Sequence, residues 1–390
     1  MIARKIKSSI PEVFKDLIRK SSLYRKIAIN QKKVMRKSEV FKVLNEAPPL
    51  YLNEIIIRKP RIGIVKTQVL ELLKGYENPN ASWLRYERFC INNNIPYSFY
   101  DIKRSNWIEE AKNYDIIICH TEGTPAYQEM IESKIYILEK VLNKMCFPSF
   151  HEVWQYEDKN RSSYLYNSYD LPTIPTLVTH DKKEAFEIAE VADYPFITKT
   201  TIGAGSSGVK KINTQHAANT LIRKIFSKRG LNTQYPYQSQ KDYFYLQTFI
   251  DNATFDLRIM LIGDMAFGYY RYPNKGDYRA SGSGNVEKKA IPLDAIKLAV
   301  KIRNKLQSRQ LGVDLLYSEK HSQYFIIETS LFNQIDSPIQ LEVNSKPGYY
   351  DISDINKIYF KEGRFWIQEL TLRNIVIQWH NANDSDFKYN

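Results

Sequence analysis

A single lysine followed by a loop of small residues is the stretch of this sequence that most clearly could do chemistry. Residues 194–209 read YPFITKTTIGAGSSGV, so Lys199 ends an apolar run and directly precedes the loop. Glycine lets backbone N–H groups approach an anion without a Cβ in the way, and consecutive N–H groups form an anion-binding concavity. We therefore expect a strand, a loop and a second strand to form a polyphosphate site with Lys199 at its base. The loop residues expected to contact phosphate are Gly203, Gly205, Ser206, Ser207 and Gly208.

The alternative for this stretch is an ordinary Gly/Ser hairpin turn with an incidental lysine. A P-loop is excluded, because no Gly-Lys-Ser/Thr sequence opens a helix here. The spacing of Gly203, Gly205 and Gly208 fits GxGxxG, but residues 209–212 predict a strand where a dinucleotide site needs a helix.

Farther along the chain, three arginines and two carboxylates occupy predicted strands and a second loop rich in glycine and serine. Arg258, Arg271 and Arg279 carry forked donors that suit phosphate or carboxylate oxygens. Asp314 and Glu328 are oxygen ligands of the kind that Mg²⁺ prefers. Each residue alone would fit a surface ion pair. The ordered set, downstream of a lysine and a glycine loop, favours a site for Mg²⁺ and phosphates.

The elements that must position these side chains begin with alternating strands and helices between residues 60 and 150. This alternation predicts a small open α/β domain with a parallel sheet. Because such sheets bind ligands at the carboxyl ends of their strands, Lys66, Thr67 and residues 120–122 are candidate contacts to an acceptor substrate. The predicted strands are 61–65, 97–101, 115–120 and 145–148, and the predicted helices are 82–93 and 125–143.

From residue 151 onward, helices are interleaved with a meander of strands. A predicted helix over 151–169 carries Lys159, a second cation suited to phosphate. The other predicted helices are 184–192, 215–226 and 293–308, the predicted strands are 243–250, 256–261, 265–271, 312–317 and 324–329, and 227–240 and 274–285 are predicted loops. From residue 359 the pattern fits a strand or a helix, with a polar tail from 381. The predicted domains are 1–50, 51–150, 151–245 and 246–390.

Length and composition indicate a folded protein with more than one domain. The chain has 390 residues, of which 43% are hydrophobic and 25% are charged. It contains no apolar run long enough for a transmembrane helix and no secretory signal pattern at its start. Cys90, Cys119 and Cys146 have no metal-site spacing, so we expect buried free thiols in a reducing, cytoplasmic compartment.

The positive charge is concentrated at the start of the chain. Of a net charge of +13, the first 46 residues contribute thirteen Lys and Arg against four acidic residues. Residues 10–18 predict a basic amphipathic helix, which could rest on an anionic membrane surface. The alternative is a basic helical arm that packs on its own domain or on a partner subunit of a homo-oligomer. Nucleic-acid binding is disfavoured, because the basic segment lacks interleaved aromatic residues.

The ordered set of motifs resembles the ATP-grasp superfamily, especially the glutathione synthetase-like and ribosomal-protein glutamate ligase branches. The resemblance covers about half of the chain, and residues 60–149 resemble the α/β domain that usually precedes it. It implies an α/β fold, α+β within the nucleotide clamp, with the basic helical arm in front. The matching strings are EDK ending at Lys159, LPTIPT, PFITK ending at Lys199, LQTFI, DLRIMLIGD, YYR, DYRAS, GVDLL and YFIIE.

The resemblance also implies roles for single residues. LQTFI resembles the hinge strand whose backbone meets adenine, which implies nucleotide contacts for Gln247, Thr248, Phe249 and Ile250. DLRIMLIGD places Asp256 in the nucleotide site as well. Arg258, Arg271 and Arg279 take catalytic roles, with Arg279 stabilising a tetrahedral intermediate.

The metal strand departs from the family pattern. The family reads Glu-x-Asn at this strand, whereas this sequence reads Glu328-Thr329-Ser330. A second string, LEVNSKPG, contains Glu342 and Asn344, but the spacing from Asp314 to Glu328 fits the family hairpin better. We therefore expect Asp314 and Glu328 to hold the metal together with a third ligand. Asn333 is the expected third ligand, and Ser330 and Asn344 remain open as alternatives.

By resemblance, the reaction is ligation of a carboxylate to an amine that uses ATP and Mg²⁺ and proceeds through an acylphosphate. The glycine loop would close over the phosphates and exclude water. The basic arm suggests a cell-surface polysaccharide or a lipid-linked precursor as substrate, at the inner face of the membrane. The alternatives are an ATP-grasp phosphotransferase and a catalytically inactive nucleotide-binding partner module.

Overall fold

The structure is a computed structural model that describes residues 35–36, 42–52, 58–66, 76–77, 81–119, 125–203, 208–233, 235, 238–251, 253–331 and 341–384. The chain divides into two compact units, residues 1–46 with 68–81 and residues 47–67 with 82–390. In the first unit, β1 (Met35–Arg36) pairs antiparallel with β3 (Tyr76–Glu77). The basic helix predicted over residues 10–18 lies outside the described residues.

The second unit begins with the predicted parallel sheet, which is confirmed. Its strands are β2 (Ile62–Val65), β4 (Tyr97–Tyr100), β5 (Ile116–Ile118) and β6 (Met145–Phe147), in the order β4-β2-β5-β6. The strands β2 and β5 are buried at every position, which is typical of a parallel sheet covered on both faces. The helices of this region are α5 (Ser82–Asn92), α6 (Trp107–Ala111) and α7 (Pro125–Tyr136), and α7 continues into a π-helical turn, η1 (Ile137–Val141).

The single helix predicted over 151–169 is wrong. The chain instead forms α8 (Phe150–Gln155) and α9 (Lys159–Ser168). Glu157 has a φ of +53°, in the left-handed region, which a helix cannot continue through. Asp158 then caps α9, because its side chain accepts a hydrogen bond from the Arg161 backbone N–H at 2.9 Å. The break makes Lys159 the first residue of a helix.

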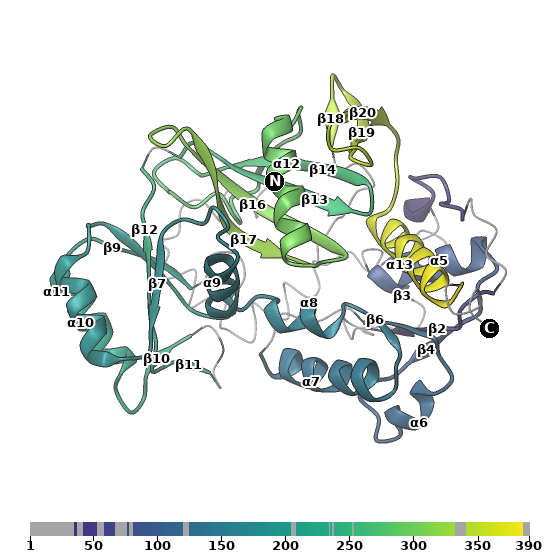
Figure 1. Ribbon diagram of the computed structural model, residues 1–390, viewed down its shortest axis with the longest axis horizontal. Helices are drawn as coiled ribbons and strands as arrows, with labels where there is room; N and C mark the ends of the chain where they lie inside the picture. The colour runs from purple at the N-terminus through teal and green to yellow at the C-terminus, as the bar shows by residue number, and fades with distance from the viewer. Residues whose placement is uncertain are drawn as a thin grey trace. The chain divides into compact units, whose positions relative to one another are not determined.

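A small antiparallel sheet carries the glycine loop. Its order is β7-β12-β8-β9, formed by β7 (Thr176–Thr179), β12 (Phe244–Thr248), β8 (Phe196–Lys199) and β9 (Val209–Ile212). The helices α10 (Lys182–Val191) and α11 (Gln215–Ile225) lie side by side against this sheet (Figure 1). Their apolar faces meet Phe196 and Phe244 in one core. The predicted loop 227–240 contains a short hairpin, β10 (Leu231–Asn232) with β11 (Ser239–Gln240).

The second unit also contains a larger antiparallel sheet. Its order is β17-β16-β13-β14-β19-β18, with β15 paired to β14 and β20 paired to β19. The helix α12 (Leu293–Lys305) shares an apolar core with β13 and β16, as its periodicity predicts. The strands are β13 (Asp256–Ile262), β14 (Met265–Tyr272), β15 (Asn285–Glu287), β16 (Gln310–Ser318), β17 (Gln323–Ser330), β18 (Glu342–Val343), β19 (Lys346–Asp351) and β20 (Tyr359–Glu362).

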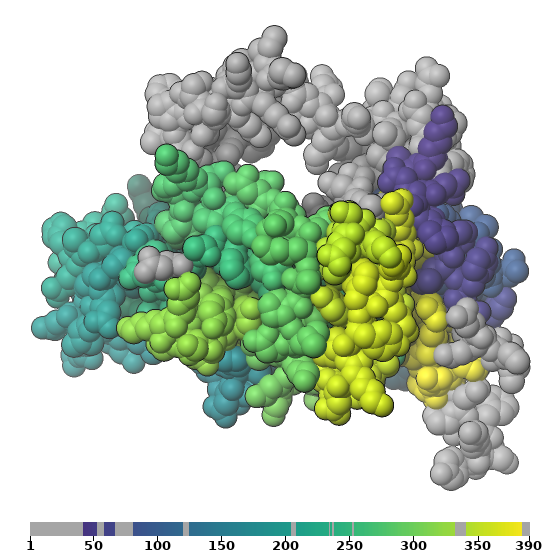
Figure 2. Space-filling view, turned by 90° about the horizontal axis from the view of Figure 1, so that it is seen from above, coloured from purple at the N-terminus to yellow at the C-terminus, as the bar shows by residue number. Residues whose placement is uncertain are grey.

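The C-terminal segment was predicted as a strand or a helix, and it contains both. After β20, the helix α13 (Ile367–Asp384) packs against α5, so the polar tail predicted from residue 381 begins within a helix. Figure 2 shows this C-terminal region, in yellow, beside the large sheet, in green. The hairpin of β18 and β19 was not predicted from the sequence. It turns at Asn344 and Ser345, which both have positive φ.

The register of the large sheet brings the predicted chemical groups together. Arg258 on β13 lies directly opposite Asp314 on β16, and Asp314 lies opposite Glu328 on β17. Asp256 on β13 lies opposite Arg271 on β14. Side chains directly opposite on antiparallel strands share a face, so four strands present their charged groups on one side of the sheet.

Candidate functional site

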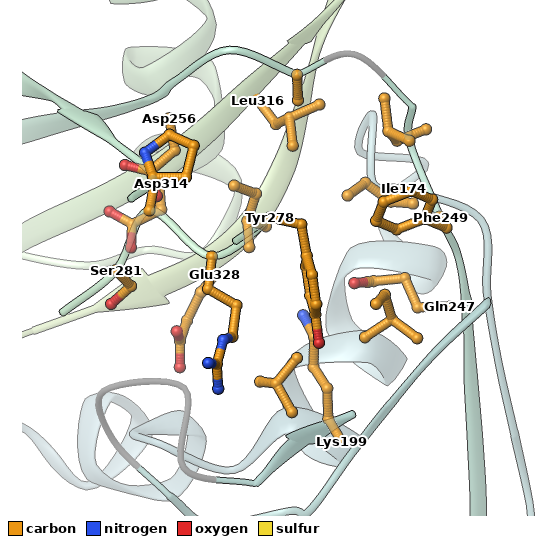
Figure 3. Close-up of a pocket in the computed structure, with 18 of the residues that line it drawn as sticks. Ile174, Lys199, Gln247, Phe249, Asp256, Tyr278, Ser281, Asp314, Leu316 and Glu328 are labelled. Atoms are coloured by element: carbon orange, nitrogen blue, oxygen red, sulfur yellow. The ribbon is translucent and has the colours of Figure 1, made fainter. Parts of the chain in front are cut away.

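A cavity of about 320 Å³ lies between the small sheet and the large sheet. It holds an apolar region at one side and charged groups at the other (Figure 3). Most of the residues predicted from the sequence to form the site line this cavity. They are Lys159, Lys199, Gly203, Gly208, Gln247, Thr248, Phe249, Ile250, Asp256, Arg271, Arg279, Asp314 and Glu328.

Several predicted residues lie elsewhere. Arg258 does not line the cavity but contacts Asp314. Asn344 lies in the turn of the β18–β19 hairpin, and four strands separate β18 from β17, which carries Glu328. Of the other candidates for a third metal ligand, Ser330 ends β17. Gly205, Ser206, Ser207 and Asn333 lie outside the described residues.

The apolar side of the cavity comes mainly from residues that the sequence reasoning missed. Ile174 lies beside Phe249 (Figure 3), and Leu316 and Ile327 also line the cavity. Leu316 could have been found, because it lies two residues after Asp314 on β16 and therefore faces the same side of the strand. Ile174 gave no such signal, since its segment reaches β17 only through a bridge from Thr173 to Ile326. An apolar slot of this kind suits an aromatic ring.

The cationic side is built from two lysines. Lys199 ends β8 and is 7% exposed, and burial lowers its pKa to about 8, although the carboxylate of Glu328 favours its charged form. Lys159 Nζ donates to the Gly203 carbonyl at 2.9 Å and lies 3.4 Å from Glu328 Oε1. Two amines therefore converge beside the glycine loop, where they can neutralise an anion.

The base of the glycine loop requires a glycine at position 208. The Thr200 N–H donates to the Gly208 carbonyl at 3.2 Å, which closes the base of the loop. A Cβ on Gly208 would lie 1.8 Å from Thr200 Oγ1, closer than any real contact. Gly208 thus serves the close approach of two chain segments, a role that the sequence pattern did not predict, since it predicted a phosphate contact.

Two arginines and two aspartates form a buried network on the large sheet. Arg258 binds Asp314 with both Nε and Nη2 at 2.7 Å, and Arg271 Nη2 also contacts Asp314 at 2.7 Å. Arg271 Nε donates to Asp256 at 2.5 Å. Burial alone would raise the pKa of Asp314, but the guanidiniums of Arg258 and Arg271 hold it well below its usual range. Burial, together with the nearby charge of Asp314, raises the pKa of Asp256.

This network bears on the predicted metal site. Asp314 is 4% exposed and already contacts two arginines, whereas the side chain of Glu328 is 37% exposed and faces the cavity. The described residues contain no cluster of three or more His, Cys, Asp and Glu that could hold a metal. Two carboxylates nevertheless fit Mg²⁺, which usually takes one or two carboxylates and completes its shell with phosphates and water.

A loop from the large sheet completes the cavity with an aromatic residue and an arginine. Tyr278 and Arg279 belong to the loop between β14 and β15, and both line the cavity. Arg279 contacts Asp277 through Nη2 at 2.9 Å, so this ion pair orients its side chain. Tyr278 projects into the cavity opposite Phe249 (Figure 3). Tyr278 was also missed from the sequence, because an aromatic residue in a polar loop has no periodic signal.

The predicted acceptor contacts of the parallel sheet are mostly outside the described residues. These are Thr67 and residues 120–122. Lys66 is described, and its Nζ lies 3.8 Å from the ring centroid of Phe99 and 4.2 Å from that of Trp83. Lys66 therefore packs between two aromatic rings.

Comparisons with known proteins match the region that forms the cavity. Residues 156–330 match the family model of the RimK-like ATP-grasp domain. The chain is 26% identical over 179 residues to the alpha-aminoadipate–LysW ligase LysX of Saccharolobus solfataricus, which covers 45% of this chain and 61% of that protein. It is 26% identical over 194 residues to the tetrahydromethanopterin:alpha-L-glutamate ligase of Methanocaldococcus jannaschii, covering 48% and 58%. The matches thus span less than two thirds of either relative.

Two solved structures align with this chain at low sequence identity. A RimK domain ATP-grasp protein from Sphaerobacter thermophilus superimposes with a TM-score of 0.47 at 14% identity, over 69% of this chain and 90% of that one. The D-alanine–D-alanine ligase of Bacillus anthracis in complex with ATP gives a TM-score of 0.49 at 12% identity, over 84% and 99%.

Proposed function

Because residues 156–330 form a RimK-like ATP-grasp domain, we propose that this protein is a ligase that uses ATP and Mg²⁺ to join a carboxylate to an amine. The observation that carries the proposal is the cavity itself. It brings an apolar slot, two lysines and two carboxylates together between two sheets. Each of these three parts matches one part of a metal-bound nucleotide: the base, the phosphates and the cation.

The nucleotide occupies the cavity with its base in the apolar slot. Ile174, Phe249 and Leu316 contact the adenine ring, and burial of an aromatic ring between apolar side chains is favourable. Lys159 and Lys199 then lie at the phosphate end and neutralise oxygen charge. Glu328 and Asp314 would hold Mg²⁺, and the ion would supply positive charge that neutralises the phosphate oxygens.

The reaction requires positioning and neutralisation more than a protein nucleophile. A substrate carboxylate oxygen attacks the γ-phosphorus, and the bond from that phosphorus to ADP breaks. The free amine then attacks the acyl carbon, so a C–N bond forms and the C–O bond to phosphate breaks. Phosphate leaves with the electron pair and takes one proton from the amine. Arg279, aimed by Asp277, stabilises the oxyanion of the tetrahedral intermediate.

We further propose that the carboxylate belongs to a cell-surface polysaccharide or a lipid-linked precursor, such as a glycan with uronic acids. The support is the excess of thirteen Lys and Arg over four acidic residues in the first 46 residues, which suits an anionic membrane surface. Within the described residues, no helix is long and apolar enough to cross a membrane. Deletion of residues 1–47 should abolish sedimentation with anionic vesicles, and unchanged sedimentation would contradict membrane association.

One assay separates this ligase from the two alternatives. The full chain is incubated with ATP, Mg²⁺, amino acids and uronic-acid glycans, and ADP, phosphate and product mass are followed. An amide product with ADP and phosphate supports the ligase. A phosphorylated product without free phosphate indicates a phosphotransferase, and nucleotide binding without turnover indicates a binding module. Lys199→Ala is the control, because it should abolish turnover or nucleotide binding.

A further inference from the structure

The first part of the glycine loop is held by a tyrosine hydroxyl that lies outside the nucleotide cavity. We call residues 200–203 the first arm of the loop. Tyr243 directly precedes β12, is 7% exposed and does not line the cavity. Its hydroxyl accepts two hydrogen bonds from Thr201, one from the backbone N–H at 2.8 Å and one from Oγ1 at 2.7 Å. Two donors of Thr201 therefore meet at one oxygen atom, which lies 42 residues farther along the chain.

The first arm is also joined to the start of α9 and to the far end of the loop. The Thr201 carbonyl accepts from the Lys159 backbone N–H at 3.0 Å, and the Gly203 carbonyl accepts from Lys159 Nζ at 2.9 Å. The Thr200 N–H donates to the Gly208 carbonyl at 3.2 Å. These bonds, together with those to the tyrosine, fix the arm from three directions.

The groups that the first arm positions face the phosphate end of the nucleotide cavity. Thr200, Gly203 and Lys159 line the cavity, whereas Thr201 does not. Because Thr201 lies between Thr200 and Gly203 and is hydrogen-bonded to Lys159, a shift of Thr201 would move all three. The Tyr243 hydroxyl can therefore act on the cavity through Thr201.

The phenol ring of Tyr243 is itself held by residues outside the loop. Its centroid lies 6.3 Å from that of the His180 ring. His180 Nδ1 contacts the Asp242 carbonyl oxygen at 2.8 Å, and His180 Nε2 contacts the Tyr164 hydroxyl at 3.0 Å. Burial raises the pKa of Tyr243, so its hydroxyl remains neutral and keeps both hydrogen bonds at neutral pH. Tyr243 is thus a fixed point against which the first arm is placed.

We propose that Tyr243 is a positioning residue of the ligase, whose hydroxyl holds the first arm in the arrangement that binds the nucleotide phosphates. A site that is already ordered avoids the entropy cost of ordering its groups when the ligand binds. Without the hydroxyl, the phosphates themselves must order the arm, so they bind less tightly. The apolar slot should be unaffected, because Ile174, Phe249 and Leu316 belong to other segments. This inference rests on the proposed function and adds a residue outside the cavity that determines phosphate affinity.

Three probes test the two ends of the cavity separately. ATP occupies both ends, inorganic tripolyphosphate occupies only the phosphate end, and adenosine occupies only the apolar slot. Calorimetric titration of the full chain with each probe, in the presence of Mg²⁺, measures the affinities. Tyr243→Phe should weaken ATP and tripolyphosphate about three- to tenfold, the scale of one neutral hydrogen bond, and leave adenosine unchanged. Equal weakening of ATP and adenosine, or an unchanged affinity for ATP, would overturn the proposal.

Two further variants assign the effect to the contact with Thr201. Thr201→Val removes the hydroxyl but keeps the backbone N–H, so it should weaken ATP less than Tyr243→Phe does. The double variant should bind ATP no more weakly than Tyr243→Phe alone, because both substitutions remove the same contact. Additive losses in the double variant would contradict the assignment.

Tyr194→Phe is the matched control. The Tyr194 hydroxyl donates to the Ala189 carbonyl at 2.6 Å, and Tyr194 does not line the cavity, so its affinity for ATP should stay unchanged. The same loss in this control would contradict a specific role for Tyr243. Urea unfolding shows whether each variant is folded. If Tyr243→Phe does not fold, the contrast between ATP and adenosine in Thr201→Val decides the question in the same way.

The same proteins distinguish this inference from the proposed function. If the unaltered protein forms an amide and ADP, and Tyr243→Phe changes neither the affinity for ATP nor the rate, the ligase stands and the role of Tyr243 falls. If Tyr243→Phe weakens ATP but not adenosine, and neither protein forms an amide, the positioning role stands and the proposed function falls.

Discussion

The ring of Tyr278 meets the ring of Phe249 edge to face, with 5.7 Å between the ring centroids and 85° between the ring planes. Phe249 directly follows β12 of the small sheet, and Tyr278 lies in the loop after β14 of the large sheet. Lys211 of β9 adds a third contact, with Nζ 3.7 Å from the Phe249 centroid. These contacts connect the two walls of the nucleotide cavity across its interior.

Tyr278→Ala should therefore speed nucleotide release. An aromatic pair contributes about 0.5–1.5 kcal/mol beyond its buried area, so the dissociation rate of a fluorescent ATP analogue should rise about three- to tenfold in stopped-flow measurements. Tyr278→Phe keeps the ring and is the control, with a rate close to that of the unaltered protein. A Tyr278→Ala protein that releases nucleotide at the original rate would show that the contact does not retain the ligand.

Nucleotide affinity should depend on the protonation of Lys199. Burial lowers the pKa of this amine to about 8, so it is charged below that pH and becomes neutral above it. The affinity for ATP should be nearly constant from about pH 7.5 to 8 and then fall by up to about tenfold per pH unit. In Lys199→Arg the fall should disappear, because guanidinium keeps its charge. A parallel decline in both proteins, measured by titration between pH 7.5 and 9.5, would assign the effect to another group.

The lowered pKa of Lys199 also predicts how the free energy of unfolding depends on pH in the absence of nucleotide. Lys199 has a folded-state pKa near 8, below the value of about 10.4 of an unfolded chain, so the unfolded state binds more protons between these two values. Its contribution should make the folded protein more stable as pH rises through this window. Urea unfolding of the unaltered protein and of Lys199→Met should show a smaller rise in the variant. The opposite sign would contradict the lowered pKa.

Asp314→Asn should destabilise the folded protein. The substitution leaves the buried Arg271, and Arg258 with a side chain only 20% exposed, with one carboxylate fewer, and breaking a buried charge pair in this way costs about 3–5 kcal/mol. The free energy of unfolding in urea measures this loss. A change below about 1 kcal/mol would mean that the network contributes no more than a surface ion pair.

Glu328→Gln should weaken the binding of Mg²⁺ and leave the free energy of unfolding almost unchanged. Its side chain is 37% exposed and its contact to Lys159 spans 3.4 Å, so the free energy of unfolding should change by less than about 1 kcal/mol. The stimulation of ATP binding by Mg²⁺ should fall about tenfold, because one of two carboxylate ligands is lost. Binding of ATP in the absence of Mg²⁺ serves as the control. If Mg²⁺ stimulates both proteins equally, Glu328 is not a ligand.

The sequence was a good guide wherever a local pattern determines the structure. The run before Lys199 and the small residues after it predicted a strand, a loop and a strand, and β8 and β9 confirm the two strands. The strands that carry Arg258, Asp314 and Glu328 were also predicted from the sequence. Local patterns therefore determined most of the cationic side of the site.

The features of the site that were not predicted depend on which distant segments of the chain pack together. The two arginine contacts of Asp314 were not predicted, because they arise from the register of β13, β14 and β16, which no local pattern encodes. The apolar slot was missed because Ile174 and Ile327 look like ordinary core residues until two sheets face each other. The helix predicted over 151–169 failed for a related reason, because helical periodicity does not reveal a single residue with left-handed backbone angles.

The left-handed backbone of that residue, Glu157, determines where α9 begins and which residue is its first. Because of the break, Asp158 caps α9 by accepting from the Arg161 N–H, and Lys159, the first residue of that helix, lines the nucleotide cavity. A glycine at 157 would adopt the same left-handed backbone without strain and keep the start of α9, whereas a β-branched residue there would strain the break.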